Sequence, residues 1–548
     1  MNKLLKKSKF ILVATSLLTL TSCGSTGSAK KTTIVWWNNY QTPEISESLT
    51  EEQARASSTY KEYYWAKDLI DAFEAEHTNI HIETVYKGSY SNIVTAVKSA
   101  LSTGDTPNMA SGYGDAVATY DAAGATLDMS SFIDDADLGF GKKSVYNADK
   151  NETTYVDDST TAKSDFNPSY LTLEKGMYNG KYLSLPFSKS SETLVVNQTV
   201  FDKEGEGECG VSNTTYTAPV AESTKEKYSV PENWVELIAT ARKMKEDFPG
   251  VFTDQRNDDG YFTAIPFCWD STQNMVISLF ENMGIPYTNG AGKTVSEQIL
   301  FNTPEAKKLL KQLKEWNEEG LICTQDQLPI TNAAKGYHAY SSNMCCEGKI
   351  FMSISSTAGT RYYANDGFVA SFNAVPSIDD GIYTMTVDST KKVTTKVMSQ
   401  GPSLTFFKKS DDVKDAQHVA CWEFYKYLTN ADNSAKLAVN TSYFPLRTAS
   451  YTNSDIVKAV ASASTKLDTT ASTADKKSHY SGEVFKLNTT YTANNSYFLS
   501  DVFSLSDAAR TAVGNMLDKI FNTRVDSTHT AESIVEEAVQ SAYESLLK

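Results

Sequence analysis

Residues 33–40 read Thr-Ile-Val-Trp-Trp-Asn-Asn-Tyr, and they begin the part of the chain that decides the fold. The first five residues of this stretch have the apolar, β-branched and aromatic composition of a buried strand. Residues 60–77 follow, where Trp65, Leu69 and Phe73 recur at i+4 spacing. This spacing predicts a helix that packs one face against a core.

A second strand and a second helix continue the alternation. Residues 80–86 predict the strand, and Gly88 then turns the chain into a helix with Ile93, Val97 and Leu101 on its apolar face. Strands that alternate with amphipathic helices are typical of an open α/β sheet.

The rest of the chain contains the same two kinds of segment, interrupted by polar stretches. Further strands are predicted at residues 108–111, 182–187, 193–197 and 349–354, and further helices at 115–123, 231–244, 304–319, 412–429, 506–521 and 531–547. Residues 139–170 predict a surface excursion, and residues 203–228 form a second polar stretch. Residues 452–500 are rich in Ser, Thr and Asn and allow no assignment.

The N-terminus carries an export signal. Lysines at positions 3, 6, 7 and 9 precede an apolar stretch at residues 10–20, which is shorter than the roughly 20 apolar residues that span a bilayer. The segment ends in Leu20-Thr21-Ser22-Cys23-Gly24, which resembles a bacterial lipobox. The alternative is an ordinary signal peptide with a chance cysteine. We expect a signal peptide at 1–22, lipidation of Cys23 and a tether at 23–32, which would hold the exported protein on the outer face of the bacterial cell membrane.

Length and charge exclude several classes of protein. The chain has 548 residues, which predicts more than one lobe. The net charge is −16, and removal of residues 1–22 deletes four lysines and no acidic residue, which leaves −20. A field of this sign repels nucleic acid and anionic lipid headgroups. We therefore expect no nucleic-acid partner, and we expect membrane attachment to come from the lipid alone.

Cysteine usage does not indicate a metal site. Six cysteines follow Cys23, and their pairing cannot be read from the sequence. No C-x-x-C motif occurs, and the histidines and cysteines form no cluster that suggests a zinc site. We expect small buried thiols, with room for a disulfide, and neither a metal nor a cofactor.

Several short stretches together resemble a known family. They are Val85–Tyr90, Ser99–Pro107, Leu183–Ser188, Pro231–Trp234, Glu347–Met352 and Thr441–Leu446. In this order, behind a lipobox, they resemble the extracytoplasmic substrate-binding proteins of carbohydrate ABC transporters, the family of maltose- and glycerol-3-phosphate-binding proteins. The likeness is strongest to the glycerol-3-phosphate-binding branch.

The resemblance implies an α/β, two-lobed periplasmic-binding-protein fold of the type II kind, in which crossing hinge segments join the lobes and the ligand lies in the cleft between them. Lobe I would comprise residues 33–187 and 402–440, and lobe II residues 188–401 and 441–548. The crossings would lie near residues 186–191, 401–404 and 441–447. Closure about this hinge would bury the ligand.

The resemblance also implies which residues face the ligand. The candidates that it supplies are Tyr90, Asp115, Ser190, Trp269, Thr357, Gly359, Gly401 and Tyr443. Trp37 and Asn38 are added only because they end the first strand. Aromatic faces and Ser, Thr and Asn side chains suit a pyranose and its hydroxyl groups. The alternatives are that Trp37 and Trp269 are core residues, and that Ser190 and Gly401 serve only the hinge.

One departure from the family bears on the ligand. The glycerol-3-phosphate-binding branch has a cleft arginine shortly before its penultimate helix, but residues 500–504 contain none. Arg510 is predicted to lie too deep in the following helix, which leaves Arg447 in the third crossing as a possible substitute. A buried phosphate needs a guanidinium partner. The sequence therefore favours an uncharged carbohydrate, with Asp115 binding hydroxyl groups.

These inferences describe a monomeric, lipid-anchored receptor that delivers a sugar or oligosaccharide to the permease subunits of an ABC transporter, and not an enzyme. An anchored glycosidase would need two carboxylates about 5 to 10 Å apart, and 67 acidic residues make such pairs uninformative. H-E-x-x-H and G-x-S-x-G are absent, and residues 290–294 resemble a P-loop without its first glycine. A surface adhesin remains the third alternative.

Overall fold

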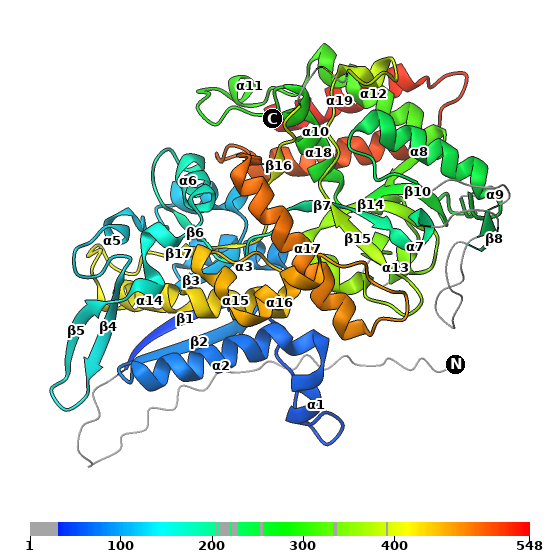
Figure 1. Cartoon of the computed structure of the whole chain (residues 1–548). Coiled ribbons are helices and arrows are strands. Elements are labelled where there is room, and N and C mark those ends of the chain that lie inside the picture. The colour runs from blue at the N-terminus through cyan, green and yellow to red at the C-terminus, as the bar shows by residue number, and fades with distance from the viewer. Residues whose placement is uncertain are drawn as a thin grey trace, which may run out of the picture.

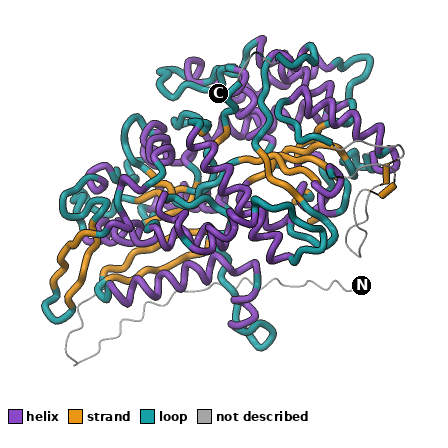
Figure 2. Tube along the Cα trace, in the orientation of Figure 1, coloured by secondary structure: helices purple, strands orange, loops and turns teal. Residues whose placement is uncertain are grey.

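The computed structural model describes residues 31–202, 207–208, 220–221, 228–252, 256–332, 337–388, 390 and 393–548. The predicted signal peptide, Cys23, most of the tether, Cys209 and most of residues 203–228 lie outside the described residues. The described part contains two separate five-stranded sheets. Figure 2 draws the strands in orange. None of the described helices combines the length and the apolar character that crossing a membrane requires.

The first sheet has the strand order β2-β1-β3-β17-β6. Its strands are β1 (Thr32–Asn38), β2 (Ile80–Tyr86), β3 (Met109–Gly112), β6 (Ser184–Pro186) and β17 (Ser403–Phe406). β1 runs parallel to β2 and β3, whereas β17 is antiparallel to β3 and β6. The helices of this lobe include α2 (Lys61–Glu76), α3 (Tyr90–Thr103), α14 (Ala416–Leu428) and α15 (Ala431–Thr441). Trp36 is fully buried between the sheet and α14, with its ring 6.0 Å from that of Phe424.

The second sheet has the strand order β11-β10-β14-β7-β15. Its strands are β7 (Glu192–Asn197), β10 (Ile265–Trp269), β11 (Ile322–Thr324), β14 (Ile350–Ser356) and β15 (Ala370–Asn373). Its helices include α8 (Trp234–Asp247), α10 (Thr272–Met283), α12 (Pro304–Glu318), α13 (Ser341–Cys346), α18 (Ser506–Asn522) and α19 (Ala531–Leu547). In Figure 1 this lobe occupies the upper right, and the blue and cyan first lobe the lower left. The predicted two-lobed α/β fold is confirmed.

Three chain segments connect the two sheets and lie side by side. Residues 187–191 lead from β6 in the first sheet to β7 in the second. The backbones of Ser190 and Gln400 exchange two hydrogen bonds of 2.9 and 2.8 Å, and residues 399–402 lead back to β17. The third segment adjoins the first, where the Phe444 amide donates to the Lys189 carbonyl at 2.6 Å. Such short shared segments are the usual form of a hinge.

Two of the polar stretches contain strands and helices that the sequence did not assign. Within residues 139–170, β4 (Lys142–Asn147) and β5 (Glu152–Asp157) pair as a projecting hairpin, and α6 (Pro168–Met177) follows (Figure 1). Residues 452–500 contain α16 (Ser454–Ser462) and α17 (Thr473–Ala493). Gly482 lets these two helices approach closely, since an added Cβ would lie 1.9 Å from the Ala459 carbonyl oxygen.

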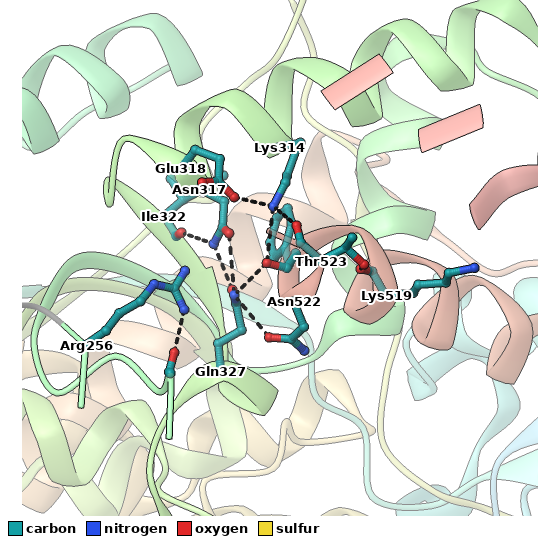
Figure 3. Close-up of polar contacts among 11 residues, drawn as sticks. Arg256, Lys314, Asn317, Glu318, Ile322, Gln327, Lys519, Asn522 and Thr523 are labelled. Carbon is teal, nitrogen blue, oxygen red and sulfur yellow. Dashed lines mark hydrogen bonds and ion pairs between the residues drawn. The ribbon is translucent and has the colours of Figure 1, made fainter. Parts of the chain in front are cut away.

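A polar cluster anchors the end of α18 on the second lobe (Figure 3). Lys314 is fully buried on α12, and its Nζ donates to the Thr523 carbonyl at 2.8 Å and also bonds to Glu318. The Asn317 amide donates to Gln327 at 2.8 Å. These contacts stabilise the last turn of α18, where backbone carbonyls lack helical partners. The start of α18 lies in the site described below.

Shorter elements complete the structure. The helices are α1 (Glu51–Ala56), α4 (Val117–Ala122), α5 (Ser130–Ile133), α7 (Gln198–Phe201), α9 (Pro249–Phe252) and α11 (Val295–Gln298), and the strands are β8 (Gly207–Glu208), β9 (Val220–Ala221), β12 (Ile330–Asn332), β13 (Tyr337–His338), β16 (Val397–Met398) and β18 (Tyr497–Phe498). Two 3-10 turns, η2 (Gly114–Ala116) and η6 (Thr357–Tyr363), bear on the site.

Candidate ligand-binding cleft

A cavity of about 290 Å³ lies where the two lobes and the crossing segments meet. This volume is at the lower end of the roughly 300–1,000 Å³ typical of small-molecule pockets. The lining residues are Tyr113, Gly114, Asp115, Glu174, Met177 and Ser403 from the first lobe, Lys189, Ser399, Gln400 and Gly401 from the crossings, and Ser271, Asn274, Ile277, Tyr287, Thr288, Met398, Leu499–Val502, Ser506 and Arg510 from the second.

An ion pair crosses the cavity between the lobes. Asp115 lies in η2 after β3, and its Oδ2 is 3.6 Å from Nε of Arg510 on α18. Arg510 also donates to the Asn274 side-chain oxygen on α10. Ser506, one turn before Arg510, donates to the Asp115 carbonyl at 2.8 Å. Residues at i and i+4 share a helix face, so the first turns of α18 present both side chains to the first lobe.

Behind this pair lies a buried carboxylate on β7. Glu192 accepts hydrogen bonds from the Trp269 indole at 2.9 Å, the Asn274 amide at 3.0 Å and the Ser278 hydroxyl at 3.3 Å. Burial raises the pKa of Glu192 despite these three donors. Asn274 therefore lies between Glu192 and Arg510, and its side chain is fixed from both sides.

A second buried ion pair lies beneath the crossings. Nζ of Lys189 is 2.8 Å from Oε1 of Glu174 on α6, and both side chains are almost completely buried. The Lys189 ammonium also donates to the Ser403 hydroxyl at 3.0 Å, and the Ser184 hydroxyl donates to Glu174 at 2.7 Å. The network joins the first two crossings to the body of the first lobe.

Two neutral polar groups of the second crossing are buried without a hydrogen-bond partner among the described residues. They are the Ser399 hydroxyl and the Gln400 side-chain amide nitrogen, and both residues line the cavity. Buried polar groups normally have partners, because an unsatisfied donor or acceptor costs about 1–3 kcal/mol. These groups are suited to bind a ligand with hydroxyl groups.

Tyrosines form one side of the cleft. The rings of Tyr90 and Tyr113 meet edge to face at 5.1 Å, and Tyr113 keeps 44% of its surface exposed at the cavity. Tyr443 of the third crossing adjoins Tyr90. Burial raises the pKa of the Tyr113 phenol, which therefore stays protonated and able to donate a hydrogen bond at neutral pH.

The structure brings some of the residues predicted for the site together. Asp115 and Gly401 line the cavity, and Tyr90 lies behind Tyr113. The Ser190 backbone pairs with Gln400 across the first two crossings. Their contacts with a ligand stay predictions.

Four other candidates lie in or near the crossings and strand ends. Thr357 is buried and accepts a hydrogen bond from the Ser191 amide at 3.1 Å, and Gly359 follows in η6. Trp37 is half-buried beneath Lys87, whose Nζ is 3.9 Å from a ring centroid. Asn38 is buried and accepts from the Tyr40 amide at 2.9 Å.

Two predicted site residues are buried away from the cavity. Trp269 is 1% exposed and lies in the core, because its indole donates to Glu192 and its ring stacks on Trp234 at 6.3 Å. Arg447 is fully buried and donates to the Ala162 carbonyl at 2.7 Å and to that of Thr429. Neither side chain lines the cavity.

The inference that Arg510 lies too deep in its helix to reach the cleft is wrong. α18 begins at Ser506, as predicted, and Arg510 lies one turn in, on the face that lines the cavity. Tyr113, Ser399 and Gln400 were not predicted as site residues. Ser399 and Gln400 directly precede Gly401, and this adjacency to a predicted crossing was the one signal in the sequence.

The described residues contain no group of His, Cys, Asp and Glu that could hold a metal ion. Cys268, Cys323, Cys345, Cys346 and Cys421 are buried, and none forms a disulfide with another described cysteine. Burial raises the pKa of the Cys345 and Cys421 thiols, which therefore remain protonated.

The fold and cleft are those of a binding protein, and sequence comparison agrees. Residues 68–464 match the family described as bacterial extracellular solute-binding protein, and the chain belongs to this family. It is similar to the sn-glycerol-3-phosphate-binding periplasmic protein UgpB of Pectobacterium atrosepticum, with 22% identity over 383 residues that cover 70% of each chain. UgpB of Escherichia coli (strain K12) is also 22% identical over 383 residues.

Solved structures share the fold at low sequence identity. UgpB from Mycobacterium tuberculosis in complex with glycerophosphocholine aligns with a TM-score of 0.58 and 11% identity, over 95% of this chain and 99% of that chain. The cyclic alpha-maltosyl-1,6-maltose binding protein from Arthrobacter globiformis aligns with a TM-score of 0.57 and 14% identity, over 94% and 99%. The predicted resemblance to this family is confirmed.

Proposed function

We propose that the protein captures a sugar or oligosaccharide in the cleft and delivers it, as a monomer, to the permease subunits of an ABC transporter. One observation carries this proposal. The cavity at the crossings combines tyrosine rings with two neutral groups, the Ser399 hydroxyl and the Gln400 amide, that have no partner in the part of the chain that the structure describes. Tyrosine faces and amide or hydroxyl groups are the usual partners of a pyranose. The names of the solved relatives that bind maltose-type sugars support this choice.

The hinge supplies the mechanism. Lobe I would comprise residues 33–187 and 402–440, and lobe II residues 188–401 and 441–548. Rotation of the two lobes about the three paired crossings changes few backbone contacts, whereas it opens or closes the cavity. A ligand that contacts both lobes favours the closed state, which is the shape that a permease would recognise.

Anchoring follows from the predicted lipobox. We propose that Cys23 carries the lipid and holds the exported protein on the outer face of the bacterial cell membrane. Replacement Cys23→Ser should move the protein from the membrane fraction to the soluble exported fraction. Persistence of the variant in the membrane fraction would contradict a lipid anchor at this residue.

Glycoside hydrolysis is less well supported. The carboxylates that line the cavity are Asp115, Glu174 and Asp501, and each is already engaged. Asp115 pairs with Arg510, Glu174 pairs with Lys189, and Asp501 accepts from the Gly290 amide at 2.9 Å. A glycosidase needs one carboxylic acid and one carboxylate free to reach the bond.

The distinction between receptor and enzyme is tested by turnover. Oligosaccharides incubated with the purified protein should be recovered intact, and calorimetric titration of those that bind should give one site per chain. Release of shorter sugars at a rate proportional to protein concentration would establish a glycosidase. Binding of sugar to many sites per chain, without saturation at one sugar per chain, would favour an adhesin.

A further inference from the structure

All charged side chains that line the cavity in the described part of the chain are engaged within the protein. They are Asp115, Glu174, Lys189, Asp501 and Arg510. The lining groups without a partner, Ser399 Oγ and Gln400 Nε2, are neutral. The cavity therefore offers a ligand mainly uncharged hydrogen-bonding groups, although the Arg510 guanidinium also lines it.

We propose that Asp115 determines selectivity: by occupying Arg510 it adapts the cleft to an uncharged, polyhydroxylated solute and excludes a phosphorylated one. This inference rests on the proposed function and extends it, because it assigns to one carboxylate the choice between two classes of ligand. A guanidinium that is free in a cleft binds phosphate through two parallel hydrogen bonds. Here Nε of Arg510 lies 3.6 Å from Oδ2 of Asp115, and Nη2 donates to the Asn274 side-chain oxygen. Nη1 faces the Met398 sulfur at 3.8 Å.

The geometry places Asp115 in direct competition with a ligand phosphate for Arg510. The Asp115 and Arg510 side chains are 32% and 31% exposed, so a ligand in the cavity can reach both. A phosphate group at Arg510 would compete with the Asp115 carboxylate for the guanidinium charge and would lie beside a group of like charge. The Ser506 hydroxyl holds the Asp115 backbone at 2.8 Å, which opposes withdrawal of the carboxylate. A sugar hydroxyl, in contrast, can donate to Asp115 without breaking the pair.

The test is a gain of binding. Asp115→Asn keeps the shape of the side chain but releases the Arg510 charge. Calorimetric titration with sn-glycerol 3-phosphate at low ionic strength should show no binding to the unmodified protein and clear binding to this variant, with an affinity increase of about tenfold or more. Unmodified protein that binds glycerol phosphate tightly, or an Asp115→Asn variant without any gain, would overturn the inference.

A matched control separates the ion pair from net charge. Asp501→Asn removes the same charge from the same cavity but leaves Arg510 paired, and it should give no comparable gain. The double variant Asp115→Asn with Arg510→Gln should lose the gain. An equal gain in Asp501→Asn, or a gain that survives in the double variant, would show that Arg510 is not responsible. Asp115→Ser provides a second release of Arg510 if the asparagine variant fails to fold.

The same titrations with neutral mono-, di- and oligosaccharides distinguish the two proposals. Neutral sugar that binds the unmodified protein, with no phosphate gain in either Asp115 variant, would overturn the selectivity role and leave the carbohydrate receptor standing. An unmodified protein that binds only glycerol phosphate would overturn both.

Discussion

Arg361 of η6 donates from Nη2 to Oε1 of Glu62 on α2 over 3.1 Å, and this contact joins the second lobe to the first outside the cavity. The two side chains are about one-fifth exposed. A second ion pair between the lobes, Lys98 to Asp507 at 2.9 Å, is more than 40% exposed on both sides. Together with Asp115 and Arg510, these pairs hold the lobes in the arrangement seen here.

Glu62→Gln should therefore weaken ligand binding although Glu62 does not line the cavity. Loss of a partly buried pair between the lobes makes the closed state less favourable, by about 1 kcal/mol, and should raise the dissociation constant roughly fivefold. A double-mutant cycle with Arg361→Gln measures the coupling. Lys98→Gln, in the more exposed pair, is the comparison and should change affinity less. A cycle with zero coupling would show that this pair does not contribute to closure.

Gly401 should tolerate no side chain. Its φ is +87°, and an added Cβ would lie 1.8 Å from the Ser188 carbonyl oxygen, where the first two crossings pair. Gly401→Ala should lower the free energy of unfolding by more than about 3 kcal/mol, as measured by urea denaturation. Gly104→Ala is the control, since φ is +77° but no atom lies within 4 Å. It should cost only about 1–2 kcal/mol. Equal effects would mean that crowding at the hinge is unimportant.

Asp270 should make stability depend on pH. Burial raises its pKa from 3.8 to about 6, so the folded protein holds this proton more tightly than the unfolded chain. The resulting stabilisation is present below about pH 4 and is lost as pH rises through 6. Asp270→Asn keeps the acceptor for the Ser341 amide. The variant should gain up to about 3 kcal/mol at pH 7.5 and nothing at pH 3.5. Thermal unfolding at both pH values is the measurement, and an equal effect at each would contradict the assignment.

The buried pair of Lys189 and Glu174 should show the cost of an isolated charge. Lys189→Met leaves the Glu174 carboxylate buried without a cation and should cost about 3–5 kcal/mol. The double variant Lys189→Met with Glu174→Gln removes that charge as well. It should recover most of the lost free energy of unfolding, as measured by chemical denaturation. Lys307→Met, which breaks a more exposed pair with Glu536, should cost less than about 1 kcal/mol. No recovery in the double variant would mean that lost packing, and not charge, dominates.

The first sheet could be predicted from the sequence because its signals are local. The apolar run at β1 and the i+4 spacing of Trp65, Leu69 and Phe73 on α2 each reflect burial on one face. α17 could not be predicted from the sequence, because its Ser- and Thr-rich sequence has low helix propensity and its burial comes from tertiary packing. Tyr480 and Phe485 pack there, and Gly482 meets α16.

The site was harder to predict than the fold, for a geometric reason. The start of α18 at Ser506 matches the prediction, but Arg510 reaches the cleft because the first turns of this helix face the first lobe, and the placement of a helix against another lobe is not encoded in its local sequence. Trp269 and Arg447 have residue types that suit a ligand site, but each has a buried partner that lies far away in the sequence: Glu192 for Trp269, and Ala162 for Arg447. Such pairings depend on the assembled fold.

Thermal unfolding of the purified protein against neutral mono-, di- and oligosaccharides and glycerol phosphates tests the central claim most directly. A ligand present at about 100 times its dissociation constant should add about 2.7 kcal/mol to the free energy of unfolding and clearly raise the midpoint. We predict a rise with a neutral sugar, diminished in Gln400→Ala, and none with glycerol phosphates. A rise with glycerol phosphates alone, or no rise with any sugar, would contradict the assignment of this cleft to a carbohydrate.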